Sequence, residues 1–504
     1  MVDTNDLKKV VLVGNNRTCQ QVAFVLGLDE YEIINELTME GFWAFAGYQI
    51  YVCEKKKQSK SIVAPSLSSE KKIKYLDDIC RWIDREYLQK RRLHKKALNK
   101  EWHGTSFFAR FKLRCFDWLV KVYFRLTGFL TISRAKKGQY AKIKNLRALR
   151  CLKPSQLFLY VLNAPVNENV YCDMNESDIQ VTRYGEIRGC CSTVIPFGHL
   201  LYDGELSEIY HSIYARIVKL SSLNGSYALC NLNGWCPYNG TEKTKLPAKS
   251  LMTKKKQAPR VITVAIDRTC NLCCKSCRNK RYVMDKARQL QTTICADKLK
   301  RSEYLDQAEQ IVVAAQGEVF YSPYYRNLLD TELKRESICL LSNGLLFNEA
   351  NWNWIKDKYK VIDACISVDA ATADTYRKIR GADFNVLLKN LRMISDLRRQ
   401  GKIRYFNLNF VVQRDNFREM PDFVRLAKSL GADHIEFQRM NNFGNLTKKE
   451  FLQKCLIIND EYLDRELWEV LQDPIFAEPI ADLRILDQYI KASALKYGQA
   501  VKDK

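Results

Sequence analysis

Four cysteines fall within eight residues near the middle of this 504-residue chain, and this run limits the fold more than any other feature. They are Cys270, Cys273, Cys274 and Cys277, and they follow a strand-like segment, residues 260–266 (RVITVAI). The spacing Cys-x3-Cys-x2-Cys places Cys270, Cys274 and Cys277 on one tight loop. Three thiolates on a short loop bind three irons of a cubane cluster and leave the fourth iron open. An open metal position is where substrate chemistry takes place.

A zinc site is the alternative interpretation of this loop, with Cys273 as the fourth ligand. The adjacent residues Cys273 and Cys274 fit one tetrahedral ion awkwardly, and no second Cys-x2-Cys pair follows nearby. The spacing and the preceding strand therefore favour an iron–sulfur cluster.

The loop resembles the signature of the radical S-adenosylmethionine (SAM) superfamily, including its common CNLxCxxC wording. The resemblance implies a [4Fe–4S] cluster held by Cys270, Cys274 and Cys277, with SAM chelating the open iron through its amino and carboxylate groups. In that family one electron from the cluster breaks a carbon–sulfur bond of SAM. The resulting 5′-deoxyadenosyl radical abstracts hydrogen from a substrate.

Strand-like and helical patterns alternate from Arg260 to about Asn445. Strand candidates begin near Val261, Gln310, Ser337, Val361, Tyr405 and His434. This alternation predicts an α/β fold whose parallel sheet curls into a partial (β/α)6 TIM-like barrel. Active groups of such barrels lie on the loops that follow the strands.

Short polar motifs follow three of these strand candidates. One resembles the family's Gly-Gly-Glu element, which lines the SAM amino group, although Gln316 replaces its first glycine. The second motif, at Asn343, resembles the family's TNG motif, which lies near SAM. The third motif, at Ser367 and Asp369, resembles the region where the family contacts the ribose of SAM. Ordinary turns are the alternative interpretation. The resemblance implies SAM contacts from Gly317, Glu318, Asn343, Ser367 and Asp369.

The end of the fifth strand candidate, Asn409 to Gln413, is expected to approach the SAM carboxylate or the substrate. Arg414 is a further candidate, although its sequence context does not separate it from an ordinary exposed arginine. No residue is nominated as a general acid, a general base or a hydrogen donor.

A second set of cysteines lies before the predicted barrel, around a predicted hairpin turn at Gly185 and a helix that starts between Gly204 and Tyr210, with Ser207 as its cap. The segment resembles the SPASM or twitch auxiliary-cluster module, because its start matches C-x12-G-x4-C. It departs from that module in preceding the core and in the wide spacing of its last cysteine pair. Zinc or reduced structural thiols are the alternatives. The implied auxiliary ligands are Cys172, Cys190 (or its neighbour Cys191), Cys230 and Cys236.

The first 150 residues show two further patterns. Residues 9–14, 18–26 and 48–53 predict a strand, a helix and a strand, as in a Rossmann-like α/β unit. Its turn lacks the G-x-G-x-x-G pattern, so a structural unit is favoured over a dinucleotide site. Residues 107–130 alternate aromatic and basic side chains, which suit a helix packed on a neighbour or, alternatively, peripheral contact with an anionic membrane.

The formal net charge of +24 suits an acidic electron donor such as flavodoxin or ferredoxin, a nucleic acid, a phosphorylated sugar carrier or an anionic membrane. The sequence contains no apolar run long enough to span a bilayer and no signal-peptide pattern, so a cytoplasmic location is expected. The 18 cysteines are clustered, which in a reducing compartment favours metal binding over disulfides.

The resemblance therefore implies a radical SAM enzyme with a second, auxiliary [4Fe–4S] cluster, acting on a peptide or protein. The alternatives are a carbohydrate or lipid-linked sugar substrate, or a non-catalytic zinc protein that binds nucleic acid. The expected order is a Rossmann-like region (1–70), a basic helical region (71–150), an auxiliary-cluster module (155–240), a linker (241–257), the radical SAM core (258–446) and a C-terminal helical region (447–504).

Overall fold

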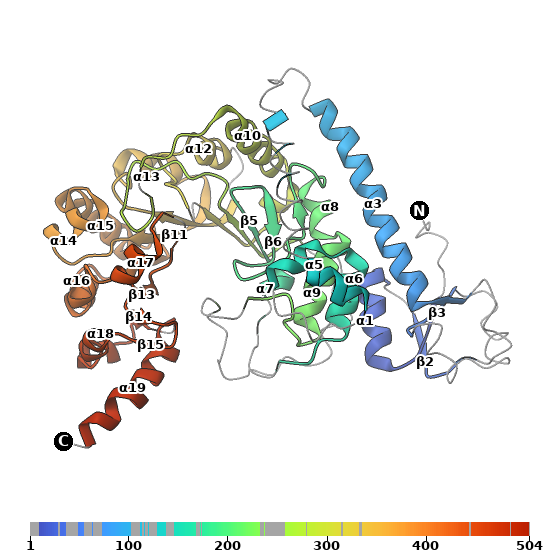
Figure 1. The fold of residues 1–504 in the computed structure, drawn as a ribbon. Coiled ribbons are helices and arrows are strands. Elements are labelled where there is room, and N and C mark those ends of the chain that lie inside the picture. Colours follow the sequence, from blue (N-terminus) through green and yellow to red (C-terminus); the bar gives the residue numbers. More distant parts are fainter. Residues whose placement is uncertain are drawn as a thin grey trace. The chain divides into compact units, whose positions relative to one another are not determined.

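The computed structural model describes residues 10–28, 31–36, 49–54, 63, 73–101, 111–112, 115, 119, 129–137, 146–167, 172, 174–231, 236, 258–278, 280–313, 316–331, 335–442, 445–483 and 485–502 (Figure 1). Internal contacts divide the chain into two compact units. The N-terminal unit comprises Met1–Ile179, Glu186–Leu232 and Tyr238–Ala258. The C-terminal unit comprises Gln180–Gly185, Asn233–Pro237 and Pro259–Lys504. The predicted linker at 241–257 lies outside the described residues.

The N-terminal unit begins with a four-stranded parallel sheet in the order β2-β1-β3-β4. Its strands are β1 (Val10–Val13), β2 (Glu32–Ile34), β3 (Gln49–Val52) and β4 (Ile73–Tyr75). Helix α1 (Asn16–Leu26) starts where the Asn15 side chain accepts a hydrogen bond from Arg17 N, and it ends at Gly27, whose φ is +72°. The predicted strand, helix and strand are therefore present.

The remaining elements of the N-terminal unit are mostly helical: α3 (Leu76–Glu101), α5 (Phe129–Lys136), η4 (Leu146–Cys151), α6 (Pro154–Leu162), α7 (Met174–Ser177), β6 (Glu186–Arg188), β7 (Gly198–His199), α8 (Leu206–Tyr210) and α9 (Ile213–Leu223). Helix α9 packs on both α1 and α6, and α3 packs on α6. These helix contacts connect the Rossmann-like, basic and cysteine-rich segments, whose assignment as separate domains stays a prediction. Most of the aromatic and basic segment 107–130 lies outside the described residues.

The predicted cap of α8 is wrong. The helix begins after Glu205, not at Ser207, because the Glu205 N–H donates to the Glu208 side chain at 2.8 Å in a capping box. The predicted turn at Gly185 does adopt the left-handed conformation, with a φ of +80°.

The C-terminal unit contains six parallel strands that lie side by side in chain order. They are β8 (Val261–Val264), β9 (Gln310–Val313), β10 (Arg335–Ser342), β11 (Tyr359–Ser367), β12 (Tyr405–Val412) and β13 (His434–Arg439). Each starts within two residues of its predicted position, so the α/β class with a parallel sheet is confirmed. The intervening helices are α10 (Lys286–Lys300), α11 (Glu303–Gln307), α12 (Pro323–Leu329), α13 (Glu349–Ile355), α14 (Ala373–Arg380), α15 (Phe384–Arg399), η6 (Phe417–Glu419) and α16 (Met420–Ser429).

Apolar packing holds this parallel sheet against its helices. Six of the eight residues of β10 are buried, as expected for a parallel strand covered on both faces. Phe410 on β12 contacts Phe423 on α16 and Phe437 on β13, with ring centroids 4.8 Å and 5.5 Å apart. Rings at these separations add to the stabilisation from burial.

The segment predicted as a C-terminal helical region needs a correction, because it also contributes strands. It contains α17 (Lys448–Lys454), α18 (Arg465–Val470), η7 (Pro474–Ala477) and α19 (Asp487–Lys502). Strands β14 (Ile457–Ile458) and β15 (Tyr462–Leu463) pair with each other, and β16 (Ala481–Asp482) pairs with β13. The segment therefore extends the parallel sheet.

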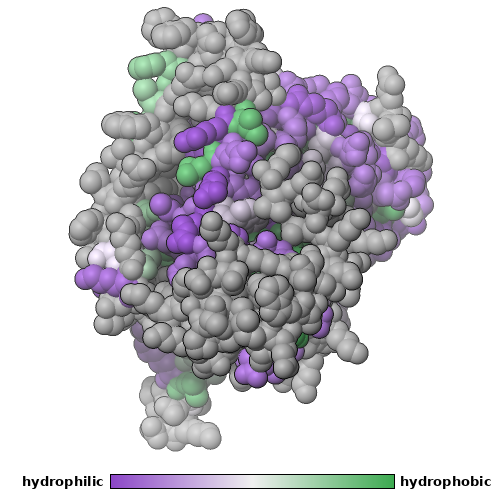
Figure 2. Space-filling view, turned by 90° about the vertical axis from the view of Figure 1, so that its right-hand side faces the viewer, coloured by the Kyte–Doolittle hydropathy of each residue, from purple (hydrophilic) through white to green (hydrophobic). Residues whose placement is uncertain are grey.

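Figure 2 shows one face of the protein, on which the described residues are mostly hydrophilic and the apolar ones form small separate groups. Within the described part of the chain, no helix combines the length and the hydropathy that crossing a membrane would require.

A partly buried ion pair in the N-terminal unit gives a pH-dependent prediction. Glu186 on β6 lies 3.1 Å from Arg150 and also pairs with Arg188. Burial opposes ionisation, but the two guanidinium groups lower the pKa of Glu186 from 4.5 to about 2. Because the folded-state pKa is the lower one, the stabilisation is present above pH 4.5 and is lost as the pH falls towards 2.

We expect Glu186→Gln to lower the free energy of unfolding at pH 7 by about 3 kcal/mol, and by less than half of that at pH 3. Urea unfolding at the two pH values measures the difference. Replacement of the exposed Glu461 by Gln serves as the control and should change little at either pH. An equal loss at both pH values for Glu186→Gln would contradict the ion-pair account.

Candidate functional site

The cysteine loop follows β8 and turns tightly on itself. The carbonyl of Cys274 accepts hydrogen bonds from Cys277 N at 2.9 Å and from Arg278 N at 3.0 Å. Cys274 is buried, whereas Cys270 and Cys277 are partly exposed. Burial raises the pKa of the Cys270 thiol to about 11, so binding of a metal there would displace a proton.

Each of the three predicted ligands has a different polar neighbour. Asn343 Nδ2 lies 3.6 Å from the sulfur of Cys270, and Arg278 Nη2 lies 3.4 Å from that of Cys277. Arg380 Nη1 lies 3.7 Å from the sulfur of Cys274. Hydrogen bonds and positive charge stabilise thiolates, so these neighbours favour the form that binds metal.

Arg278 also fixes the shape of the loop from inside. Its side chain is buried and donates to the carbonyl of Arg268 at 2.6 Å and to that of Gln316 at 3.1 Å. One guanidinium therefore connects the start of the loop, its last cysteine and the segment after β9. The five N–H groups of arginine suit such multiple contacts.

Gly317 is the point where the segment after β9 meets the cysteine loop. A Cβ atom here would lie 2.7 Å from the carbonyl oxygen of Asp267 and 2.9 Å from that of Thr269. The next residue, Glu318, donates its N–H to the Thr269 carbonyl at 3.0 Å. Only glycine allows the two backbones to approach this closely.

Glu318 turns inward instead of facing solvent. Its carboxylate accepts hydrogen bonds from Ser342 Oγ and from Asn343 N, both at 2.8 Å, and its side chain is fully buried. Burial raises its pKa to about 7 despite these donors. The predicted contact of Glu318 with the SAM amino group stays a prediction, and in this structure the carboxylate links the ends of β9 and β10.

Asn343 reaches directly into the cysteine loop. Its Nδ2 donates to the side chain of Asn271 at 2.8 Å, and its Oδ1 accepts from Leu345 N at 3.1 Å. The following residue, Gly344, has a φ of +78°, and a Cβ there would lie 2.5 Å from the side chain of Leu387. The Asn343–Gly344 turn thus requires a glycine at its second position.

Asp369 and Arg380 connect the end of β11 to the same loop. Asp369 has a φ of +66°, which is uncommon for a residue other than glycine. Its carboxylate lies 2.8 Å from Arg380 Nη2 and accepts from Val411 N at 2.8 Å. Burial raises the pKa of Asp369, and Arg380 opposes that shift. Since Arg380 also contacts Cys274, the pair is part of the wall of the site.

The remaining candidates have different surroundings. Ser367 is partly exposed at the end of β11. Asn409 accepts a hydrogen bond from Asn407 Nδ2 at 2.7 Å. Arg414 was not separable from an exposed arginine in the sequence, but it pairs with Asp464 at 2.6 Å, so its guanidinium has a structural partner.

Three thiols on one tight loop are a donor set of the kind that binds a cubane cluster. Among the described residues, no three His, Cys, Asp or Glu side chains gather as closely as the ligands of a single ion must. The thiolates of a cubane bind different irons and stand farther apart. In the same described part of the chain, the buried Tyr376 Oη lacks a hydrogen-bond partner, and the charges of Cys274 and Arg380 act on it. Unpaired buried polar atoms beside a cluster loop suit a polar ligand.

The zinc alternative gains no support from Cys273. Its thiol lies 3.6 Å from the carbonyl oxygen of Arg278, to which it donates. That orientation gives Cys273 a hydrogen-bond acceptor, so a role as fourth ligand would require it to leave this partner.

Three of the predicted auxiliary cysteines lie in one part of the N-terminal unit. Cys172 packs against Tyr227 and Cys230, and Asn175 Nδ2 lies 3.4 Å from the Cys230 sulfur. Thr193, whose backbone bridges to Cys230, lies 3.4 Å from the Cys190 sulfur and donates to Asn175 Oδ1 at 2.6 Å. The fourth cysteine, Cys236, belongs to the C-terminal unit.

Cys190 and its neighbour Cys191 differ in exposure. Cys191 is exposed, whereas Cys190 is partly buried. Hydrogen bonding by Cys191 and Thr193 lowers the pKa of Cys190 to about 6, although burial opposes this shift. A thiol with a lowered pKa is the better metal ligand.

Sequence reasoning missed Arg278, Asn271 and Asp267 as parts of this site. Asp267 is fully buried and accepts from Thr269 N at 2.8 Å, and its own N–H donates to the hydroxyl of Tyr325 at 3.1 Å. The sequence did offer a signal by position, because Asp267 directly follows the strand segment 260–266 and Arg278 directly follows the last cysteine.

Gly317→Ala tests the close approach of the two backbones. The added methyl group overlaps two carbonyl oxygens, so we expect the free energy of unfolding, measured by denaturant titration, to fall by about 1–3 kcal/mol. We also expect a lower iron content after anaerobic reconstitution. Gly498→Ala in α19 is the matched control, because nothing lies within 4 Å of its Cβ position and alanine favours a helix. Normal stability and iron content in Gly317→Ala would refute this role for the glycine.

Comparisons with known proteins give partial matches. No protein-family model matches the chain. A curated relative, the AdoMet-dependent heme synthase of Oleidesulfovibrio alaskensis, is 27% identical over 176 residues, which cover 35% of this chain and 44% of the relative. The chain thus matches less than half the length of this relative.

Two solved structures show a distant likeness. Streptococcus suis SuiB bound to S-adenosylmethionine is 14% identical, with 44% of this chain and 45% of SuiB covered and a TM-score of 0.30. The enzyme anSMEcpe with bound AdoMet is 17% identical, with 42% of this chain and 57% of that chain covered and a TM-score of 0.30. The cysteine motif and the partial match to the AdoMet-dependent heme synthase thus make this chain similar to radical SAM enzymes.

Proposed function

We propose that the chain is a radical SAM enzyme that abstracts hydrogen from a peptide or protein substrate. The observation that carries this proposal is the cysteine loop, whose three thiols each meet a polar side chain from a different part of the C-terminal unit. A [4Fe–4S] cluster bound to Cys270, Cys274 and Cys277 would supply one-electron cleavage of SAM to a 5′-deoxyadenosyl radical.

The residues of the chain would hold and shield these reactants. Arg278 fixes the loop, while Asn343 and Arg380 orient the thiols of Cys270 and Cys274. In our proposal the six parallel strands form a partial barrel whose carboxyl ends surround SAM. Such a wall excludes water and stray hydrogen donors from a reactive centre. SAM contacts are proposed for Gly317, Glu318, Asn343, Ser367 and Asp369.

A second [4Fe–4S] cluster is proposed in the auxiliary module. The grouping of Cys172, Cys190 and Cys230 within the N-terminal unit supports it. Cys236 is the proposed fourth ligand, with Cys191 as the alternative to Cys190. An auxiliary cluster would accept an electron from the substrate radical or orient the substrate.

One proposed partner follows from charge. A formal charge of +24 favours an acidic electron donor such as flavodoxin or ferredoxin.

Cys274→Ala should abolish SAM cleavage, because it removes one of three ligands of the proposed cluster. Release of 5′-deoxyadenosine and methionine from anaerobically reconstituted protein under reductant measures this activity. Cys273→Ala is the matched control on the same loop and should retain cleavage and iron. Cleavage that survives in Cys274→Ala, or that disappears in Cys273→Ala, would show that the ligands are misassigned.

Cys230→Ala should remove the signal of the auxiliary cluster and lower the iron content by roughly four atoms per chain. SAM cleavage should continue without substrate turnover. Cys455→Ala, which also removes a buried thiol, is the control and should leave the iron content unchanged. Electron paramagnetic resonance and iron analysis provide the readout, and full iron content in Cys230→Ala would exclude the auxiliary cluster at this position.

A further inference from the structure

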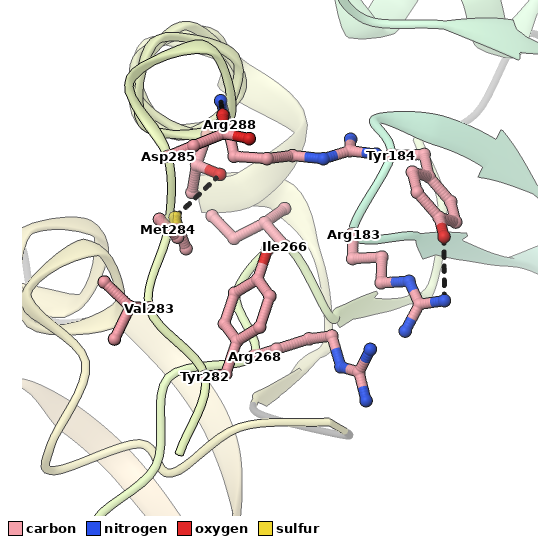
Figure 3. Close-up of a pocket in the computed structure, with 10 residues that line it drawn as sticks. Arg183, Tyr184, Ile266, Arg268, Tyr282, Val283, Met284, Asp285 and Arg288 are labelled. Carbon is pink, nitrogen blue, oxygen red and sulfur yellow. Dashed lines mark hydrogen bonds between the residues drawn. The ribbon is translucent and has the colours of Figure 1, made fainter. Parts of the chain in front are cut away.

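A cavity of about 280 Å³ opens in the C-terminal unit beside the start of the cysteine loop (Figure 3). Its lining comes from the turn after β5 (Asp178–Val181), from the end of β8 and from the segment that leads into α10. The lining residues are Arg183, Tyr184, Ile266, Arg268, Tyr282, Val283, Met284, Asp285, Arg288 and Thr292. None of them belongs to the proposed SAM contacts.

Hydrogen bonds hold the turn against this wall. Ala265 N donates to the carbonyl of Val181 at 2.8 Å, and the side chain of Gln291 on α10 donates to the carbonyl of Tyr184. Gly185, with its positive φ, reverses the chain directly afterwards. The position of Arg183 and Tyr184 at the cavity is therefore built into the fold of this unit.

Positive charge dominates the cavity, with three arginines against one aspartate. The guanidinium carbons of Arg183 and Arg288 lie 4.7 Å and 4.6 Å from the centre of the Tyr184 ring. That of Arg268 lies 5.6 Å from the centre of the Tyr282 ring. Arg183 Nη2 also donates to the Tyr184 hydroxyl at 2.8 Å (Figure 3). Arg288 Nη1 donates to Gln291 Oε1 at 2.5 Å. A guanidinium carries five N–H groups in a planar fork, which suits the binding of oxyanions.

The opposite part of the lining is apolar. Ile266 and Met284 contribute aliphatic and thioether surface, and Thr292 Oγ1 lies 3.7 Å from the Met284 sulfur. Val283 is 83% exposed, and its side chain points away from the other labelled residues (Figure 3). The cavity is small compared with sites that enclose whole ligands, so it suits one group of a larger molecule.

Two features connect the cavity to the proposed cluster: the position of Arg268 in the sequence and the contacts of the Arg278 side chain. Arg268 precedes Cys270 by two residues, and its carbonyl accepts from Arg278, which also contacts the sulfur of Cys277. A molecule anchored here would therefore have its other end close to the cysteine loop.

We propose that this cavity binds a carboxylate that the substrate carries on a short apolar stem, with Arg183, Arg268 and Arg288 as the anion-binding residues and with Ile266 and Met284 beside the stem. The inference rests on the proposed function, because it makes the cavity a substrate-anchoring site of that enzyme. It narrows the substrate class to molecules with an acidic group, such as a peptide with an acidic side chain or terminus.

Asp285 favours a carboxylate over a phosphate. Its side chain lines the cavity and accepts from Arg288 N at 2.9 Å as the N-cap of α10. A fixed negative charge nearby penalises the second charge of a phosphate more than the single charge of a carboxylate. The apolar wall likewise suits the hydrocarbon stem of a carboxylic acid.

Binding of small probes to the full-length, anaerobically reconstituted protein tests the proposal. The probes are 3-phenylpropionate, its neutral amide and 2-phenylethyl phosphate. Binding of each probe is measured by ligand-observed NMR titration in the absence of SAM. We expect 3-phenylpropionate to bind with a Kd of the order of millimolar, as suits a fragment of this size. The amide should bind at least about tenfold more weakly, because it loses the charge-assisted hydrogen bonds.

The double variant Arg183→Gln/Arg268→Gln should weaken binding of 3-phenylpropionate by about tenfold or more. Arg399→Gln, on the exposed side of α15, is the control and should bind normally. Equal binding of acid and amide, stronger binding of the phosphate, or unchanged binding in the double variant would each overturn the proposal.

The comparison of acid and amide uses the unaltered protein, so it decides the question even where the double variant fails to fold. The titration needs no SAM turnover, and the cleavage assay needs no occupant of the cavity. A negative titration with normal SAM cleavage would therefore contradict only this inference. A negative cleavage assay with normal probe binding would contradict only the proposed function.

Discussion

The site depends on a contact between two backbones. Residue 317 lies so close to the carbonyls of Asp267 and Thr269 that any side chain would collide with them. This contact brings the end of β9 against the loop that carries the three cysteines. Arg278 closes the same junction from the interior by binding carbonyls on both sides. Without this junction the thiols would have no fixed relation to the strands beside them.

Around this junction the chain buries polar groups that would destabilise an ordinary core. Glu318, Asp369 and Arg380 are almost completely enclosed, and Asp369 also adopts an uncommon left-handed backbone. Buried charges persist where partners compensate them, and here each has a partner on a neighbouring strand or loop. Such a concentration of enclosed polar groups is typical of functional sites.

Much of this could be predicted from local sequence. Alternating strand and helix patterns located β8 to β13 within two residues, and the cysteine spacing singled out the loop. The cap of α8 was assigned wrongly because a glutamate pair, Glu205 and Glu208, competed with the more usual serine. Local sequence patterns predict an element correctly where tertiary packing favours the same conformation.

Other features depend on partners far away in the chain and had no local signal. Arg414 resembled a surface arginine, yet its partner Asp464 lies fifty residues later. The inward turn of Glu318 depends on Ser342 and Asn343 at the end of the next strand. The anion-binding cavity combines a turn before the cysteine loop with a helix after it, so neither segment predicts it alone.

The measurement that tests the central claim most directly is Mössbauer spectroscopy of 57Fe-reconstituted protein in which Cys230 has been replaced, so that one cluster remains. The account predicts that adding SAM changes the signal of one iron in four, because that iron has no protein ligand. A spectrum that is unchanged by SAM, with all four irons equally ligated, would contradict it.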